Sequence, residues 1–529
     1  MAKRDLSIYR APDDVTSLLK RRERAMSRKA NWRDLLDTTY SYFLPNRNVW
    51  NRQTTPGENL NADVYDSSGP LGLRKFVNRM INALTPPDQN WVSFVAGTEI
   101  PEESVEEVNL QLQNITDTFF FYLRQSNFDL VIHEAFTDMA ISTGVMQANE
   151  GSEDEPLIFS AIPSDTVAYD SGPRGDLSAF YRDWGGITAD HAFHIWGEEF
   201  LIPEQLKNRD KPIEMDLYEI SYYDFVDKIY KYLVIEKSSK QVVYFKVEES
   251  WEWIGFRWAK LAGEDSGRGP AIDAMPTVAT INKAVADELK SAALKANPPY
   301  MAFTDTVINP WTFKIAPNEV IPVNPTGTGT WPIAPLPGGG DISFTAIVIN
   351  DLRAQVADIM MAQPTQPIQN GPVRTATEVI SVQNDLRENA GAQFIRVQTE
   401  LFDPLVRRVL WILQRKGLIP ELIIDGKQVS LNYLTPLSLS KNETDLQKFM
   451  LWYQAVATVL GPEAAIGVIN APKFPRWSGE KAGAELDLIK DEQEIITLLQ
   501  QAQEAAKDAI DGEQPGPEAA GAAAEGFAT

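Results

Sequence analysis

The three histidines are the residues of this chain that metal or acid–base chemistry would use first. His191 and His194 are three positions apart, so a helix would place both on one face, where both side chains face a single metal ion. The chain has no cysteine, however, and the carboxylates near this pair follow no ligand pattern. His133 precedes a glutamate but lacks the second histidine of a zinc-protease helix. We therefore interpret all three as structural histidines and expect no metal.

Sequence signatures of nucleotide binding and nucleophilic catalysis are also missing. There is no GxxxxGK[ST] phosphate loop and no Gly-x-Ser-x-Gly nucleophile elbow. Residues 327–329 (Gly-Thr-Gly) lack the strand–turn–helix setting of a dinucleotide site. The acidic segment Gly151–Pro156 has no other ligand near it in sequence, which favours an exposed hairpin tip over a metal site. The sequence predicts a protein without enzymatic activity and without a cofactor.

Composition and charge describe a large, acidic chain. Its 529 residues, 43% of them apolar, can fill several hydrophobic cores. The formal net charge of −24 argues against a protein that grips nucleic acid through its overall field. The lack of cysteine suits a reducing, cytosol-like compartment. The first residues show no signal-peptide pattern and no apolar run has membrane-spanning length, so no membrane association is expected.

The stretch Gly267–Gly417 organises the chain, and its pattern predicts three helices. The first spans residues 269–297 and ends before two prolines, because proline disfavours helical geometry in the residue before it. The second spans residues 342–363 and also ends before a proline. Apolar residues recur in both at the spacing of one helix face: Val278, Ile281, Val285, Leu289 and Ala292 in the first, and Phe344, Val348, Leu352, Val356 and Ile359 in the second.

The third predicted helix, residues 375–417, is unusually long. At about 1.5 Å per residue it would span roughly 60 Å, more than an ordinary domain helix. Pro404 cannot donate a hydrogen bond to the Glu400 carbonyl, so a kink is expected there. Gly417 then supplies a C-terminal stop. The three helices show no catalytic pattern and resemble the walls of a large assembly.

From Met146 to Trp258 the pattern changes to short β-like runs separated by turn signals. Examples of the predicted strands are Leu157–Ile162, Ala179–Trp184, Tyr218–Tyr223, Ile229–Glu236, Gln241–Glu248 and Trp253–Trp258. One short helix is expected at Thr188–Trp196. Runs of this kind indicate an antiparallel sheet, so the sequence as a whole predicts an α+β fold.

The part of the chain before this region is predicted to be mainly helical. Val15–Phe43 has the pattern of one basic amphipathic helix, whose charged residues we interpret as a solvated face rather than a patch for DNA or a partner. A second helix begins after Asp66 or Ser67, either of which can cap it. Further elements are expected at Trp91–Phe94 (strand), Val105–Ser126 (helix) and Phe128–Gly144 (helix).

Three further segments have distinct compositions. Residues 298–341 are rich in Pro and Gly and too long for a plain loop, which indicates a small insertion module. Gln428–Tyr433 is predicted to be a strand that returns to the sheet, and Leu446–Leu460 a helix. From about Ala502 the chain is rich in Ala, Glu and Gly, so disorder is expected there.

Four motifs, in this order, resemble those of the portal (head-to-tail connector) proteins of T7-like, short-tailed bacteriophages. They are Val64–Gly69 followed by Leu84–Trp91, then Gly267–Pro276, Arg374–Val379 and Leu401–Leu405. Each motif is weak alone, but the four occur in the same order across nearly the whole chain, and this makes the resemblance strong. The family positions that carry over are structural rather than catalytic: Arg268, Gly269, Pro270, Thr375, Thr377 and Glu378.

The resemblance implies a homo-oligomeric ring, commonly of twelve subunits, at one capsid vertex of the virion and assembled in the host cytoplasm. Its parts would be a wing (1–268), two stem helices (269–297 and 342–363), a clip (298–341), a tunnel loop (364–374), a long wing or crown helix (375–417), a C-terminal wing or crown region (418–501) and a disordered acidic tail (502–529). Some relatives extend the C-terminal part into a helical barrel, which the Ala/Gly-rich tail here does not favour.

The resemblance also implies a channel for packaging and ejecting double-stranded DNA. The implied partners are the terminase packaging motor, major capsid and scaffolding proteins, and tail adaptor proteins. Candidate DNA-channel residues are Lys283, Lys290, Arg353, Gln366, Gln369, Asn370 and Arg374, and candidate docking residues in the clip are Trp311, Phe313, Trp331 and Ile333.

Several alternatives stay open at the level of sequence. Lys283, Asp287 and Lys290 share one helix face, and either line the channel or form ion pairs between subunits. Arg374 either faces DNA or pairs with Glu378 one turn on. The alternative function is another scaffold or coiled-coil assembly protein of a virus particle, although a continuous rod would not need the folded insertion.

Overall fold

The computed structural model contains two compact units. It describes residues 6–12, 14–47, 63–101, 104–197, 200, 214–296, 300–302, 333–335, 342–362, 391–422, 429–434, 436–461, 467–469, 472–482 and 494–497. The first unit comprises the described residues of Met1–Asn82, Thr118–Thr375 and Asp385–Leu422. The second comprises those of Ala83–Asp117 and Ile423–Thr529. Helices and antiparallel sheets occur together, which confirms the predicted α+β class.

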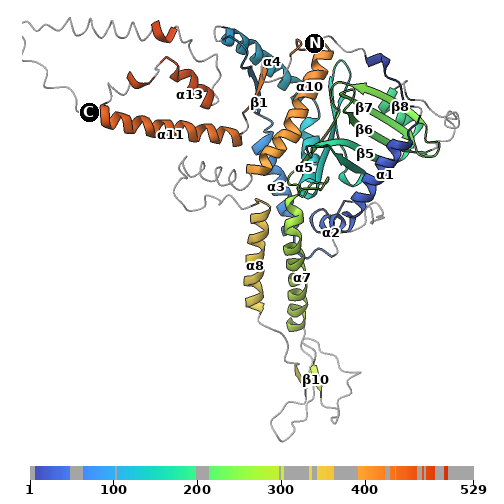
Figure 1. The fold of residues 1–529 in the computed structure, drawn as a ribbon. Coiled ribbons are helices and arrows are strands. Elements are labelled where there is room, and N and C mark those ends of the chain that lie inside the picture. Colours follow the sequence, from blue (N-terminus) through green and yellow to red (C-terminus); the bar gives the residue numbers. More distant parts are fainter. Residues whose placement is uncertain are drawn as a thin grey trace, which may run out of the picture. The chain divides into compact units, whose positions relative to one another are not determined.

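The first unit contains a five-stranded antiparallel sheet (Figure 1). Its strands, in spatial order, are β4 (Val167–Ser171), β5 (Leu177–Thr188), β6 (Glu214–Asp224), β7 (Ile229–Glu236) and β8 (Val242–Glu248). Successive side chains point to opposite faces, so the two faces bury different clusters. Phe180 belongs to one cluster, while its neighbours Ala179 and Tyr181 belong to the other. The strands predicted for this sheet are confirmed, with longer bounds for β5 and β6, whereas β4 is a strand that the sequence examples did not include.

A second, three-stranded sheet has the order β3-β2-β9. Its strands are β2 (Thr143–Glu150), β3 (Leu157–Ala161) and β9 (Trp253–Arg257), and α5 (Phe128–Ile141) packs against it. The predicted extension of α5 to Gly144 is wrong, because that glycine already pairs with Phe256 of β9. Gly151–Pro156 forms the largely exposed tip of the β2–β3 hairpin, as predicted.

The basic N-terminal segment is two helices rather than one. These are α1 (Thr16–Ala30) and α2 (Arg33–Phe43), separated by a turn at Asn31-Trp32. The preceding short helix η1 spans Leu6–Ile8, and η3 spans Ser164–Thr166. In Figure 1, α1 (blue) lies beside the large sheet, and its contacts are with β4 and β5.

The interpretation of the basic residues of α1 as a solvated face is wrong for Arg22 and Lys29, which are buried. Arg22 is buried and pairs with Asp183 of β5, while Arg28 pairs with Asp170 of β4. The Lys29 ammonium is buried and donates hydrogen bonds to the Ser164 and Val167 carbonyls. Acidic and carbonyl groups distant in sequence therefore bind these three side chains, which periodicity alone does not reveal.

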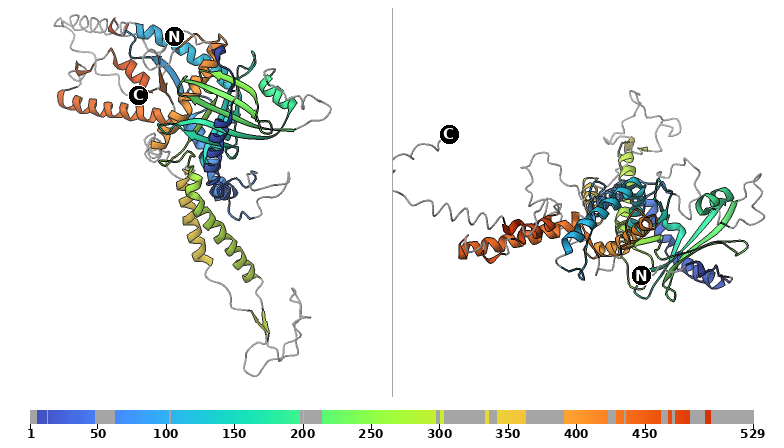
Figure 2. Two further views of the ribbon diagram at one scale, coloured as in Figure 1. Left: turned by 45° about the vertical axis from the view of Figure 1, so that its right-hand side comes forward. Right: turned by 90° about the horizontal axis from the view of Figure 1, so that it is seen from above.

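Two long helices, α7 (Pro270–Ala296) and α8 (Ile342–Ile359), pack side by side, as Figure 1 and the left view of Figure 2 show. Their bounds agree closely with the predicted 269–297 and 342–363. Between them the described residues include one antiparallel strand pair, β10 (Tyr300–Ala302) with β11 (Ile333–Pro335). Trp311, Phe313 and Trp331 lie outside the described residues, and Ile333 is described only as the first residue of β11.

The described part of the predicted long helix contains a change of helical type. Residues 391–397 are α-helical, Gln398–Phe402 form a π-helical turn, and α10 follows (Asp403–Arg415). The Asp403 N–H donates to the Gln398 carbonyl, and Pro404 occupies the start of α10. The disturbance predicted at Pro404 thus takes the form of a π turn just before it. Gly417 has φ +72° and ends the helix, as predicted.

The second unit contains a separate two-stranded sheet. In it β1 (Val92–Ala96) pairs antiparallel with β12 (Val429–Tyr433). The prediction that Gln428–Tyr433 returns to the large sheet is therefore wrong, since its partner is the strand predicted at Trp91–Phe94. The remaining helices of the described chain are α3 (Ser68–Leu84), α4 (Val105–Gln125), α6 (Ala189–Trp196), α11 (Pro436–Leu460) and α13 (Phe474–Ala482).

The sequence predictions on membrane association and on the tunnel loop and tail bear on different parts of the chain. Among the described residues, no helix has the length and apolarity needed to cross a membrane. Residues 363–390 and 498–529, which include the predicted tunnel loop and the whole of the predicted tail, lie outside the described residues.

Candidate functional site: the paired helices and their anchors

The start of α7 is fixed by a glycine that no other residue can replace without movement. A Cβ built on Gly269 would lie 2.0 Å from the Ala140 carbonyl oxygen of α5, far inside van der Waals contact. The Gly269 N–H donates to the Ile141 carbonyl at 3.1 Å. Pro270 follows as the first helical residue, where its missing N–H costs nothing. This close approach gives a physical reason for the Gly-Pro pair singled out in the sequence.

Arg268 supports the same corner through its side chain. Its guanidinium makes two hydrogen bonds to the Glu264 carboxylate, at 2.9 and 2.8 Å, and lies over the Trp32 ring at 4.6 Å. The hydrogen bond and charge of Arg268 lower the pKa of Glu264. Arg268 is thus a structural position in this unit, in agreement with its predicted role.

A short segment before α3 is joined to α7 and α8 by hydrogen bonds and an ion pair. The Asn282 side chain accepts hydrogen bonds from the N–H groups of Tyr65 (2.6 Å) and Asp66 (3.2 Å). The Arg353 guanidinium pairs with the buried Asp66 carboxylate at 2.6 Å. The other Asp66 oxygen accepts the Ser68 N–H at 2.9 Å, confirming Asp66 as the predicted cap. Although burial opposes the shift, bonds from Ser68 and Arg353 lower the pKa of Asp66.

The predicted DNA-channel residues differ in their exposure and in whether their charge is already paired. Lys283 and Lys290 lie on the exposed side of α7, and Lys290 forms a weak 3.5 Å pair with Asp287 on the same helix. Arg353, in contrast, has its charge engaged by Asp66. The other candidates, Gln366, Gln369, Asn370 and Arg374, lie outside the described residues, as do Thr375, Thr377 and Glu378.

Large apolar side chains are exposed on both paired helices. Val278 and Ile281 near the start of α7 are buried, but Leu289 on the same predicted stripe is 55% exposed. On α8, Ile347 and Val348 are also exposed. The apolar stripe predicted for these helices is therefore only partly covered within one chain.

Glu400 in the π turn is fixed by Arg257 at the end of β9. The Arg257 guanidinium is fully buried; its Nη2 lies 2.6 Å from Glu400 Oε1 and its Nε 3.0 Å from Oε2. The Arg257 backbone N–H also donates to Oε2 at 3.0 Å. This carboxylate accepts three hydrogen bonds from one residue, so it fixes the π turn against the three-stranded sheet.

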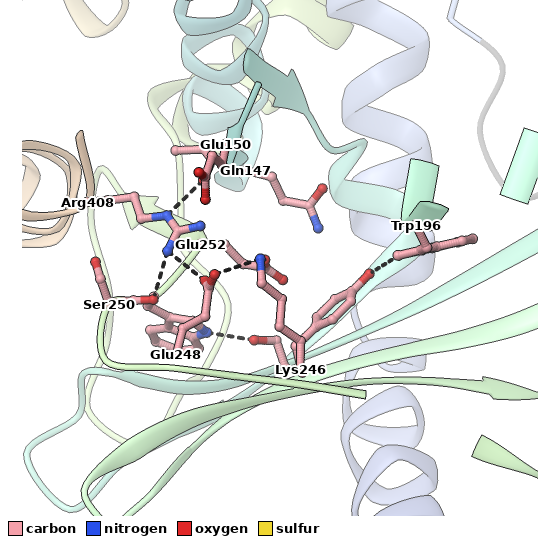
Figure 3. Close-up of polar contacts among 12 residues, drawn as sticks. Gln147, Glu150, Trp196, Lys246, Glu248, Ser250, Glu252 and Arg408 are labelled. Atoms are coloured by element: carbon pink, nitrogen blue, oxygen red, sulfur yellow. Dashed lines mark hydrogen bonds and ion pairs between the residues drawn. The ribbon is translucent and has the colours of Figure 1, made fainter. Parts of the chain in front are cut away.

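A second anchor, shown in Figure 3, fixes α10 through the fully buried Arg408. Its Nε donates to the Ala148 carbonyl at 2.9 Å, and its Nη1 to Glu248 at 2.6 Å and the Ser250 carbonyl at 3.0 Å. Lys246 pairs with the same carboxylate of Glu248 at 2.6 Å. Sequence reasoning missed this anchor, although Arg408 interrupts the apolar stripe of α10, which is a readable signal.

Another carboxylate, that of Glu252, is buried close to Glu248 and Arg408 (Figure 3). Burial raises its pKa to about 7, and the neighbouring Glu248 charge acts in the same direction while Lys246 and Arg408 oppose it. Glu252 Oε1 has no hydrogen-bond partner within the part of the chain that the structure describes. The anchor of α10 thus contains one carboxyl group that gains or loses its proton near neutral pH.

The candidate metal residues do not gather. His133, His191 and His194 are all exposed, and α6, which carries the last two, is capped by Thr188 as a plain surface helix. No cluster of three or more His, Cys, Asp or Glu side chains suited to a metal occurs among the described residues. The features that stand out are therefore structural. They are the paired helices α7 and α8, the close contact at Gly269, and the buried ion pairs of Arg257 and Arg408.

Comparison with known proteins identifies the class. Residues 15–489 match the family of bacteriophage head to tail connecting proteins, so the chain belongs to that family. It is a structural component that connects the head of a phage particle to its tail, and the portal-type resemblance inferred from the sequence is confirmed.

Individual relatives are more distant. The chain is 21% identical over 430 residues to the "Probable portal protein" of Bordetella phage BPP-1, covering 76% of this chain and 74% of that one. Among solved structures it is similar to a chain of the virion of a native gene transfer agent (GTA) particle, with 13% identity, a TM-score of 0.38, and coverage of 84% and 99%. A chain of the neck of an empty GTA particle gives 12% identity and the same TM-score, with coverage of 86% and 94%.

Proposed function

We propose that this connector is the portal protein of its phage, forming a closed ring at one capsid vertex. The single observation that carries the ring is the incomplete burial of α7 and α8, where Leu289, Ile347 and Val348 stay exposed in one chain. Apolar side chains on paired helices need a neighbour, and cyclic symmetry supplies one for every copy. Family membership and the name of the Bordetella phage relative support the same function.

Sedimentation and negative-stain imaging of the purified full chain test this proposal. We expect closed rings without any added cofactor, commonly of twelve subunits. A stable monomer at micromolar concentration would overturn the proposal, and rods instead of rings would favour the coiled-coil scaffold alternative.

Within such a ring, α7 and α8 are the stem helices, and double-stranded DNA passes along the channel that they surround. A net charge of −24 suits a channel that must not hold DNA, because every phosphate contact adds salt-dependent affinity. The exposed Lys283 and Lys290 on α7 offer weak contacts of this kind. Replacing both with Gln should leave rings intact and change the salt dependence of DNA packaging.

Residues 298–341 are assigned to the clip, where the packaging motor and later the tail adaptors dock, while the wing contacts capsid and scaffolding proteins during assembly in the host cytoplasm. Deletion of 303–332 should abolish both clip interactions in a pull-down. Persistence of both would contradict the assignment.

A loop with three prolines in eleven residues joins α8 to the long helix. Its prolines favour a semi-rigid arch, and its amides and one arginine are suited to touching DNA without strong charge attraction. Shortening it should preserve rings and impair the packaging or retention of DNA. Normal packaging by shortened rings would reduce this loop to a connector.

A further inference from the structure

The second half of α11 carries no charge on any side. From Phe449 to Leu460 the sequence is Phe-Met-Leu-Trp-Tyr-Gln-Ala-Val-Ala-Thr-Val-Leu, three turns without Asp, Glu, Lys or Arg. A helix that faces water on one side normally carries charged residues there, whereas one that is apolar on all sides is normally buried. This half of α11 therefore has the composition of a helix enclosed by protein.

Only one side of this helix is packed in the described chain. Phe449 stacks on Phe474 of α13 with ring centroids 5.2 Å apart, and also lies 5.1 Å from the Trp477 ring. The Phe449 side is thus the one that faces α13.

The opposite side is open. Leu451, Ala455 and Val459 recur every four residues, so they form one line along the helix, which we call the α11 stripe. Leu451 is 66% exposed and Val459 82% exposed, and Ala455 is exposed as well. None of the α11 side chains that the structure describes is fully buried. Helices gain most of their stability from packing an apolar face, and the described residues leave the α11 stripe without such a packing partner.

We propose that the neighbouring subunit of the ring covers the α11 stripe. This inference rests on the proposed portal ring, because a ring provides every copy with the same neighbour. The cores of protein interfaces are depleted in charge and rich in apolar and aromatic residues, which is the composition of this helix. In a cyclic ring the contact joins two different surfaces, so the stripe meets another surface of the next subunit and not its own copy.

The absence of cysteine makes the test direct, since one introduced thiol is the only thiol of the chain. In assembled rings, the thiol of the Val459→Cys variant is challenged with a polar maleimide; in a separate experiment, dissociated chains are labelled with a benzophenone maleimide. Val226→Cys in the β6–β7 turn is the matched control, because Val226 is 89% exposed and the substitution is the same. In rings, we expect the thiol of the Val459→Cys variant to react at least tenfold more slowly than that of the control variant. Labelling of the dissociated Val459→Cys chains, reassembly and irradiation should then give covalent dimers.

Each other outcome overturns the proposal in a different way. Equal reactivity of the two thiols in rings would show that the stripe is open. Crosslinks that map within one chain would show that another segment of the same subunit covers it. Rapid disulfide formation between two copies of the Val459→Cys variant would show a symmetric pairing of two stripes, which a cyclic ring contact excludes.

A second pair of variants tests the contribution to assembly. Leu451→Glu/Val459→Glu should abolish rings while preserving the helical circular dichroism of the chain. Gln454→Glu adds the same kind of charge to the same helix at an exposed polar position and should keep rings. Rings from the double variant would overturn the inference alone, whereas a monomeric wild type would overturn the proposed function and the inference with it.

Discussion

Arg257 and Glu400 form a buried, bidentate ion pair that joins the end of β9 to the π turn of the long helix. Two guanidinium nitrogens reach the two carboxylate oxygens at 2.6 and 3.0 Å, and the Arg257 guanidinium is fully buried. Removal of one member of such a pair leaves the other charge buried without compensation. The pair therefore controls whether the helix before α10 keeps its position on the sheet.

Glu400→Gln should lower the free energy of unfolding of the first unit by about 3–5 kcal/mol, because Arg257 stays charged and buried. Asp287→Asn, which breaks only the exposed 3.5 Å pair with Lys290, is the matched control and should cost about 0.5 kcal/mol or less. Urea denaturation followed by tryptophan fluorescence measures both. Equal, small shifts in the urea midpoint would contradict the anchoring role of Glu400.

Glu252→Gln should alter how stability depends on pH. The folded pKa of Glu252 is about 7, raised from its ordinary 4.5, so the folded state binds more protons than the unfolded state between these values. The contribution of Glu252 to stability is therefore present below pH 4.5 and is lost as the pH rises towards 7. Relative to wild type, the variant should gain about 1 kcal/mol between pH 6 and pH 8.

Urea midpoints at the two pH values check this, with the exposed Glu153→Gln of the β2–β3 hairpin tip as control. The control should follow wild type at both pH values. Parallel behaviour of Glu252→Gln and wild type would show that Glu252 is ionised throughout this range in the folded protein.

Gly269→Ala should prevent the correct docking of α7 on α5. The added methyl group meets the Ala140 carbonyl oxygen at 2.0 Å, and backbone cannot move aside as a flexible side chain can, so a loss of about 3 kcal/mol or more is expected. Gly391→Ala is the matched control in the described helix before the π turn. A Cβ on Gly391 meets nothing within 4 Å, so this substitution should be neutral or stabilise by up to about 1 kcal/mol. Thermal unfolding distinguishes the two, and similar midpoints would refute the close-packing argument.

Arg353→Gln should weaken the fold more than it changes contact with DNA. The Asp66 carboxylate is buried and loses its cation, which should cost about 1–2 kcal/mol after allowance for the partial exposure of Arg353. Lys283→Gln, on the exposed side of α7, should leave the urea midpoint unchanged. Stability and DNA packaging are both measured for each variant. An unshifted midpoint together with impaired packaging for Arg353→Gln would place Arg353 in the channel instead.

The periodicity of apolar residues and the positions of prolines, glycines and capping residues were sufficient to predict most helices and strands. The spacing of apolar residues and the flanking prolines predicted α7 and α8 to within a few residues, and Thr188 and Gly417 marked a helix start and a helix stop. These features act over one or two turns of chain, so the sequence carries them locally. The portal-type resemblance came from the same linear information, as four motifs in order.

Only the tertiary structure decided which distant groups meet. The basic residues of α1 looked like a solvated face, yet Arg22 and Lys29 are buried and hydrogen-bonded to groups more than one hundred residues away. Strand β12 has the alternation expected of any strand, and only folding selected β1 as its partner. The pairs Arg257–Glu400 and Arg408–Glu248 likewise depend on approach in space, because a charge has no periodicity that names its partner. Sequence specifies local geometry through short-range sterics and hydrogen bonds, whereas electrostatic and strand pairing are chosen only when the whole chain is compact.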